Sequence, residues 1–122
     1  MYRAVRAANS VRRFAADAHQ RKRRLGGSEL SVTVLGQGGA PLGDLYEQIS
    51  NAQAEACLDA AHDAGVTLFD TSPWYGLGLS EMRFGLALHR KPRDSFVLQT
   101  KLGRDLLPRA HRTARDLSLI HI

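Results

Sequence analysis

Three short runs of strand-forming residues alternate with two segments of helical periodicity between residues 34 and 101. The runs cover residues 34–39, 66–70 and 96–101, and they end in glycine, aspartate and lysine respectively. Single helices between successive strands form right-handed crossovers, which build a parallel sheet that helices cover. We therefore expect an α/β fold with the order strand, helix, strand, helix, strand.

The ends of the predicted strands indicate which kind of parallel sheet this is. Polar residues follow successive strands at their carboxyl ends, where closed barrels carry their functional groups. The glycine-rich stretch after the first strand is no dinucleotide fingerprint, because Pro41 stands where that motif needs glycine. A (β/α)8 TIM barrel needs eight strands and about 250 residues. We therefore expect the N-terminal three strands of such a barrel, which stays incomplete in this chain.

The two helical segments carry apolar residues three and four positions apart. In the first, the side predicted to be buried consists of Ala54, Cys57, Leu58, Ala61 and Gly65. This pattern predicts that Cys57 is buried and unreactive. The second helix is expected to begin near Ser80, with the serine hydroxyl as its cap. Its apolar side is predicted to comprise Leu79, Met82 and Leu86.

The amino-terminal part of the chain is strongly basic. Of the net charge of +5, residues 1–24 contribute +7, so that the remaining residues carry −2. We expect residues 1–22 to be a disordered basic extension, followed by a β-hairpin around Gly26 and Gly27. A basic-tailed nucleic-acid binder is an alternative interpretation of this charge. The sequence has neither a recognition motif nor interleaved aromatic residues for it, so we predict no nucleic-acid partner.

Several classes of protein are excluded by what the sequence lacks. It contains no run of about 18 apolar residues and no secretory signal, so we expect a cytoplasmic protein without a membrane partner. The single cysteine cannot form an internal disulfide or a cysteine-based zinc site, and we predict no metal. The histidines lie outside the predicted strand tips, and we expect them to be solvated or packed: His19, His62, His89, His111 and His121.

Two motifs at neighbouring strand tips carry a resemblance to a known family. Residues 69–81 combine Asp70 at a strand end, Tyr75 five residues later and a Gly-x-Gly-x-Ser-Glu helix start, which resembles the aldo-keto reductase signature. Lys101, in Thr-Lys-Leu-Gly-Arg at the next strand tip, matches the family's catalytic lysine. The resemblance covers residues 23–108. Residues 38–43 are most similar to the sugar dehydrogenase branch, which includes D-threo-aldose, L-fucose and pyridoxal dehydrogenases.

The resemblance implies an NAD(P)-dependent oxidoreductase that transfers a hydride to or from a small carbonyl or aldose-type substrate. Such a transfer changes the charge on the substrate oxygen, so a proton must be donated or removed there. An adjacent ammonium group helps a tyrosine to exchange its proton because it favours the phenolate, and a carboxylate can balance that buried ammonium. The implied catalytic residues are Tyr75 as proton donor or acceptor, Lys101 and Asp70.

The resemblance also implies where the cofactor and substrate lie. The backbone at Gly38, Gly39 and Ala40 would lie beside the nicotinamide, and Asp70 would help to hold the attached ribose. Trp74 is expected to form either packing or one wall of the substrate pocket, and we favour the pocket. The cofactor is NADP, the commoner choice in the family, or NAD, which the sugar dehydrogenase branch often uses. No oligomeric state is predicted.

The family's remaining functional groups have no counterpart here. Its catalytic histidine lies on a fourth strand, and its contacts to the cofactor pyrophosphate come from later segments. We therefore expect residues 23–111 to be the N-terminal portion of such a barrel and to be inactive alone. Residues 112–122 match nothing in the family and are expected to be a non-native tail. A non-catalytic, cofactor-sensing barrel and a degenerate fragment are the alternatives.

Overall fold

The structure is a computed structural model that describes residues 21–103. The strands are β1 (Lys22–Arg24), β2 (Ser31–Thr33), β3 (Gly36–Gly38), β4 (Leu68–Asp70) and β5 (Val97–Gln99). The helices are α2 (Asn51–Asp63) and α3 (Leu79–Leu88), with short 3-10 turns η1 (Pro41–Gly43) and η2 (Arg93–Ser95). The predicted disorder of the amino-terminal extension, the predicted non-native tail and three histidines, His19, His111 and His121, lie outside the described residues.

The central sheet is parallel, with β4 between β3 and β5. Gly38 pairs with Asp70, and Asp70 pairs with Gln99, so that all three strands end at one edge. This confirms the predicted α/β order, and the three strands form an open sheet. The first strand is shorter than predicted because the amide of Val34 donates to the Arg21 carbonyl (2.7 Å) and so belongs to the hairpin.

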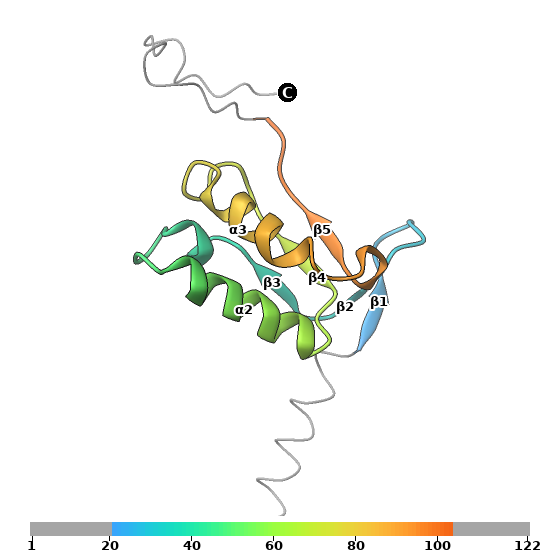
Figure 1. Cartoon of the computed structure of the whole chain (residues 1–122). Coiled ribbons are helices and arrows are strands. Elements are labelled where there is room, and N and C mark those ends of the chain that lie inside the picture. Colours follow the sequence, from blue (N-terminus) through green and yellow to red (C-terminus); the bar gives the residue numbers. More distant parts are fainter. Residues whose placement is uncertain (1–20, 104–122) are drawn as a thin grey trace, which may run out of the picture.

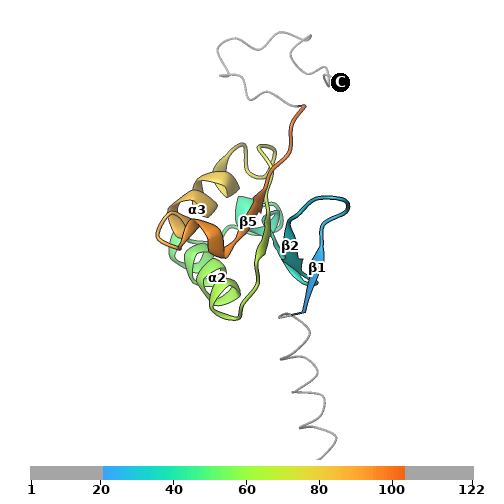
Figure 2. The ribbon, with the colours of Figure 1, turned by 90° about the vertical axis from the view of Figure 1, so that its right-hand side faces the viewer.

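Helices α2 and α3 lie side by side against one face of this sheet (Figures 1 and 2). The ring of Phe69, on β4, points into the layer between sheet and helices and is fully buried. It meets Phe84 of α3 and Phe96 edge-on, at centroid distances of 6.4 and 6.1 Å. Edge-to-face contacts of this kind fix ring orientation as well as burying area. The core therefore holds the middle of β4 in a set position beneath the site.

Helix α2 begins with a capping box, in which Ser50 and Gln53 each accept a hydrogen bond from the other's backbone amide. Its buried residues are Ala54 and Leu58. The predicted burial of Cys57 is wrong, because its side chain is exposed. Ala61 packs against the same core and is partly buried, so the inward stripe of α2 comprises Ala54, Leu58 and Ala61 and leaves Cys57 beside it.

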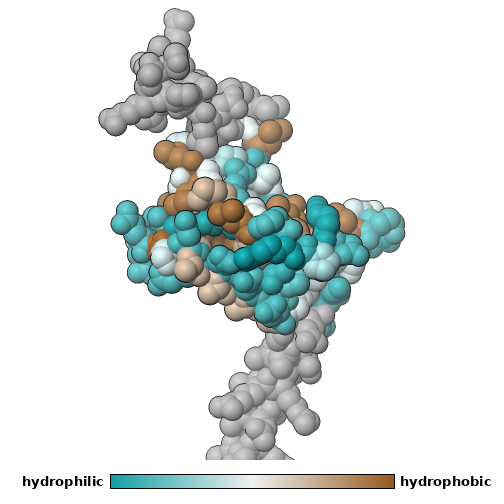
Figure 3. All heavy atoms as spheres, in the orientation of Figure 1, coloured by the Kyte–Doolittle hydropathy of each residue, from teal (hydrophilic) through white to brown (hydrophobic). Residues whose placement is uncertain are grey.

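Helix α3 differs from the sequence prediction in its cap and in its buried side. The cap is Gly78, which has a left-handed backbone (φ 96°), and Ser80 makes no cap hydrogen bond. Glu81 occupies the first turn, as expected at the positive end of a helix dipole. The buried residues are Ser80, Arg83, Phe84, Ala87 and Leu88. Met82 and Leu86 are instead 47% and 52% exposed. Apolar residues are visible at the surface of the described part of the chain in Figure 3.

The predicted hairpin is formed by β1 and β2, which pair antiparallel. It includes Lys22, which the sequence analysis had assigned to the basic extension. Thr33 and Thr67 join the hairpin to the sheet, because each side-chain oxygen accepts the other residue's amide at 2.9 Å. Within residues 21–103, no helix is both long and apolar enough to cross a membrane.

Candidate active site

Asp70 and Lys101 meet at the carboxyl edge of the sheet. Asp70 is the last residue of β4, and Lys101 follows β5 by two positions. The Lys101 Nζ atom donates to Asp70 Oδ1 and Oδ2, at 3.0 and 2.8 Å, and to the Thr71 carbonyl, at 2.9 Å. All three donor positions of the ammonium group are thus engaged by β4 and its continuation. This arrangement fixes the direction of a long side chain that would otherwise be mobile.

Tyr75 is brought to the same edge by the loop between β4 and α3. Gly76, Leu77 and Gly78 all have left-handed backbones, with φ of 65°, 53° and 96°, so the chain turns sharply after the tyrosine. The loop packs on η1 so closely that a Cβ atom on Gly43 would lie 2.4 Å from the Tyr75 carbonyl carbon. Lys101 Nζ lies over the Tyr75 ring, 5.1 Å from its centroid.

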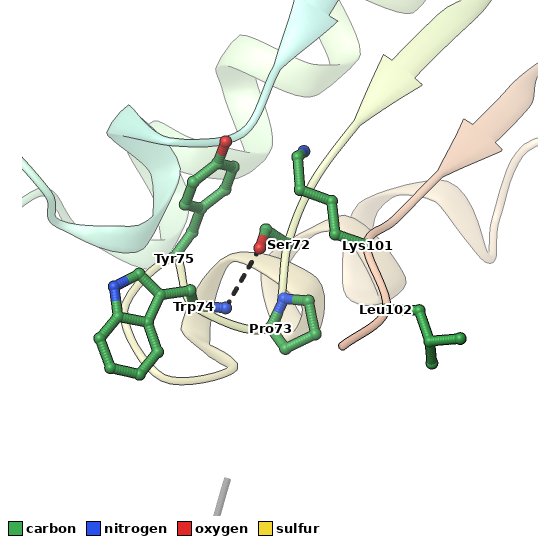
Figure 4. Close-up of a pocket in the computed structure, with 6 residues that line it drawn as sticks. All are labelled: Ser72, Pro73, Trp74, Tyr75, Lys101 and Leu102. Atoms are coloured by element: carbon green, nitrogen blue, oxygen red, sulfur yellow. Dashed lines mark hydrogen bonds between the residues drawn. The ribbon is translucent and has the colours of Figure 1, made fainter. Parts of the chain in front are cut away.

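A pocket of about 360 Å³ opens between these groups (Figure 4). In this view the phenol of Tyr75 and the amine of Lys101 point the same way on either side of the open space, toward the strand ends. Trp74 and Leu102 lie at opposite sides of the pocket mouth. The remaining lining residues are Ser72 and Pro73. Trp74 is 48% exposed, so that its indole can offer a flat apolar surface to a molecule in the pocket.

Asp70 has the largest influence on the pKa of Lys101. Its hydrogen bonds raise the pKa of Lys101 above the ordinary lysine value, against the opposing effect of partial burial. Lys101 therefore keeps its positive charge throughout the neutral range. The ammonium is half exposed, so solvent screens this interaction and its stabilising effect is modest.

The glycines at the end of β3 have two different roles. A Cβ atom on Gly39 would lie 2.9 Å from the Asp70 carbonyl oxygen and 2.7 Å from Ser80 Oγ, so Gly39 permits close packing of β3 on α3. A Cβ atom on Gly38 would meet nothing within 4 Å. Gly38 pairs with Asp70, and the space beside its Cα atom is open.

Arg83 is an important residue that the sequence analysis missed. Its guanidinium group, only 5% exposed, donates to the Leu42 and Ile49 carbonyls and to Asp44 Oδ1, each at 2.7 Å. It also donates to Asn51 Oδ1 at 3.0 Å. The hydrogen bond from Arg83 is the main reason why the pKa of Asp44 is lowered. Arg83 thereby holds the segment that packs against the backbone of Tyr75.

The two described histidines lie on or beside helices. His62 shares a hydrogen bond with Ser95 (2.9 Å), and His89 lies next to the Gly85 carbonyl at the end of α3 (3.1 Å). Neither lines the pocket.

Comparison with known proteins gives consistent matches. A family model described as the aldo/keto reductase family matches residues 34–118. The chain is 51% identical to the D-threo-aldose 1-dehydrogenase of a Pseudomonas species over 88 residues, which cover 72% of this chain and 27% of that relative. It is 48% identical to the pyridoxal 4-dehydrogenase of Microbacterium luteolum over 83 residues, 68% of this chain and 24% of the relative. The chain thus spans about a quarter of the length of these relatives.

A solved structure shares the fold as well as the sequence. The holo form of an aldo-keto reductase from Bacillus halodurans matches with a TM-score of 0.64 and 32% identity. The match covers 73% of this chain and 28% of that structure.

Proposed function

Because the chain belongs to the aldo/keto reductase family of NAD(P)-dependent oxidoreductases, we propose that the protein carrying it transfers a hydride between a nicotinamide cofactor and an aldose-type substrate. The family and the barrel type that the sequence predicted are both confirmed by the comparisons. The activity is assigned to a protein with the remaining parts of the barrel, and residues 21–103 alone are proposed to be inactive. We place this protein in the cytoplasm.

One observation carries the proposal. Lys101 Nζ binds the Asp70 carboxylate and lies over the ring of Tyr75 at the rim of a pocket. An ammonium held near a phenol favours transfer of the phenolic proton. We assign to Tyr75 the donation of a proton to the carbonyl oxygen in reduction, and its removal in oxidation. Lys101 supplies the positive charge, and Asp70 orients Lys101 and balances that charge.

The cofactor, when bound, would supply or accept the hydride. We propose that the backbone of Gly38, Gly39 and Ala40 holds the nicotinamide, since the open space at Gly38 allows close approach. Asp70, at the paired position on β4, would bind the ribose through the carboxylate surface that Lys101 leaves accessible. The residues described here make no distinction between NAD and NADP, and both belong to the proposal.

The substrate would enter between Trp74 and Leu102. We propose that the indole of Trp74 forms one wall of the substrate site, because an aromatic face suits the C–H face of a sugar. The D-threo-aldose 1-dehydrogenase, a relative at 51% identity, supports an aldose over other carbonyl compounds.

Sequencing the source locus past codon 112 gives the reading frame that continues the barrel. The protein expressed from that frame is used to test the proposal. The expressed protein is supplied with NAD or NADP and a panel of aldoses, and formation of the reduced nicotinamide is followed by its near-ultraviolet absorbance. We expect turnover of at least one aldose with one cofactor. Binding of cofactor without turnover of any aldose, ketone or aldehyde would instead favour a cofactor-sensing barrel.

A further inference from the structure

Two buried hydroxyl groups connect the ends of β3, β4 and α3. Thr71, which follows β4, is 2% exposed, and Ser80, in the first turn of α3, is fully buried. Their side-chain oxygens lie 2.8 Å apart, and the Ser80 hydroxyl donates to the Gly39 carbonyl at 2.8 Å. A carbonyl can only accept, so the single Ser80 proton is used there. Thr71 must therefore donate to Ser80, which gives a chain of bonds with one direction, from Thr71 through Ser80 to Gly39.

The backbone of Thr71 extends this chain to the catalytic lysine. Its amide donates to the Gln99 carbonyl at 2.8 Å, and its carbonyl accepts from Lys101 Nζ at 2.9 Å. One residue thus contacts Lys101 through its backbone and, through its hydroxyl and Ser80, reaches Gly39. Hydrogen bonds through Thr71 therefore connect Lys101 with the glycine backbone at the end of β3.

Packing alone would hold α3 on the sheet without these hydroxyl groups. Phe69, Phe84 and the absence of a side chain at Gly39 already bring the elements together. Burying two hydroxyl groups costs free energy unless both form hydrogen bonds. Hydrogen bonds also orient the groups that they join, which apolar contacts do not. What the bonds add is a fixed orientation of the Gly39 carbonyl, and hence of the peptide plane that joins Gly39 to Ala40.

We propose that Thr71 and Ser80 are positioning residues for the cofactor. Their hydrogen bonds hold the backbone of residues 38–40 in the position that lets the nicotinamide bind against it. The inference rests on the proposed function, which seats the nicotinamide against this backbone. Neither residue touches the cofactor in this scheme. Their effect passes through the Gly39 carbonyl.

The chain contains a matched control at the other end of β4. Thr33 and Thr67 also bring two threonine hydroxyls together, and Thr33 is 2% exposed, as Thr71 is, whereas Thr67 is partly buried. Each accepts the other's amide at 2.9 Å, and Thr33 donates to the Leu35 carbonyl at 2.7 Å. Thr67 precedes β4, whereas Thr71 follows it. Removing the Thr33 hydroxyl therefore also deletes a buried hydroxyl donor, at the end of β4 away from the site.

The experiment compares Thr71→Val, Ser80→Ala and Thr33→Val in the full-length protein. Dissociation constants for NADH and NADPH are measured by fluorescence titration, and thermal midpoints are measured alongside. We expect Thr71→Val and Ser80→Ala to raise both dissociation constants about tenfold, because the backbone that contacts the nicotinamide is then no longer held in one position. Thr33→Val is expected to lower the thermal midpoint similarly while leaving both dissociation constants within about twofold. Thr71→Ser retains the donor and should restore binding.

Equal weakening of cofactor binding by Thr71→Val and Thr33→Val would overturn the inference, because stability alone would then explain both. If the unaltered protein binds neither NADH nor NADPH, the proposed function fails instead. In that case, amide hydrogen exchange of residues 36–40 decides the positioning role. Faster exchange in Thr71→Val and Ser80→Ala, but not in Thr33→Val, supports it, and equal exchange in all three variants rejects it.

Discussion

Lys101 lies over the ring of Tyr75, with Nζ 5.1 Å from the ring centroid, although the two residues lie in different loops at the carboxyl edge of the sheet. The loop before α3 supplies the phenol, and the segment after β5 supplies the ammonium. The backbone of Tyr75 is held by its packing on Gly43, and the side chain of Lys101 is held by Asp70. Different contacts within the chain therefore bring the two residues together.

Replacement of Tyr75 by phenylalanine tests the proton-transfer role. The ring and its packing remain, but the transferable proton is lost, so we expect kcat of the full-length protein to fall by about 100-fold or more. The dissociation constant for the cofactor should stay within about threefold, since no contact to the cofactor is assigned to the hydroxyl. Steady-state kinetics and fluorescence titration provide the two measurements. An equal loss of turnover and of cofactor binding would contradict the assignment.

The Asp70–Lys101 pair predicts a pH dependence of stability. The folded-state pKa of Lys101 is raised, so the pair's contribution is complete below the pKa of an unfolded lysine and is lost as the pH rises through the higher folded value. Asp70→Asn should therefore lower the free energy of unfolding by at most about 1 kcal/mol at pH 8, because the pair is half exposed. The difference should shrink above about pH 10, the ordinary range for lysine. Urea titrations between these values measure it, and a difference that grows with pH would refute the prediction.

Alanine at Gly39 should lower stability, whereas alanine at Gly38 should lower only the affinity for the cofactor. Gly39→Ala places a Cβ atom against the Asp70 carbonyl, and we expect it to cost about 2 kcal/mol in stability. Gly38→Ala meets only open space, so the free energy of unfolding should change by less than about 0.5 kcal/mol. If the nicotinamide lies there, Gly38→Ala should nevertheless weaken cofactor binding by about tenfold. Unchanged binding in this variant would place the cofactor elsewhere.

Arg83 should be far more important for stability than Arg90, which follows α3. Arg83→Met removes the guanidinium donor from the Leu42 and Ile49 carbonyls and the ion pair from Asp44, and we expect a loss of about 3 kcal/mol. Arg90→Met is the control, because Arg90 pairs with Glu55 and Asp59 on the surface. It should change the free energy of unfolding much less. Denaturant unfolding compares the two variants, and losses of similar size would show that the buried bonds contribute little.

The 122-residue chain expressed alone should associate. Several large apolar side chains of residues 21–103 are exposed over α3 and β5, among them Leu86 and Leu98. Apolar surface of this kind promotes self-association. Light scattering should rise with protein concentration, and a double variant with lysine at Leu86 and Leu98 should reduce it. A soluble monomer with one sharp thermal transition would disprove this expectation.

The residues of the site could be found from the sequence because the fold makes a simple rule apply. Parallel strands end at one edge, so the polar residues after β4 and β5, Asp70 and Lys101, had to come close together. Their hydrogen bonds agree with that reasoning. Gly76 and Gly78 belonged to the family resemblance that identified Tyr75, and their left-handed backbones explain how Tyr75 reaches the same edge.

The rest of the site depended on contacts that no local pattern encodes. Arg83 looks like a solvent-facing residue of an amphipathic helix, yet its partners are Leu42, Asp44 and Ile49, in a loop far away in the sequence. Ser80 has the residue type and position of a helix cap, but Gly78 takes that role and frees the hydroxyl to point inward. Helical periodicity likewise identified the face of α2 without giving its width, which is why the prediction for Cys57 was wrong.

Strand β5 lies at the edge of the described sheet, so its outer backbone groups have no strand beside them in residues 21–103. A parallel strand added there would continue the register in which Asp70 pairs with Gln99, and its carboxyl end would arrive next to Lys101. Each further parallel strand would therefore place one more side chain at the same edge of the sheet, and the contacts of the residues already there would not need to change. New functional groups can be added to this fold at the end of each further strand, next to the Asp70–Lys101 pair.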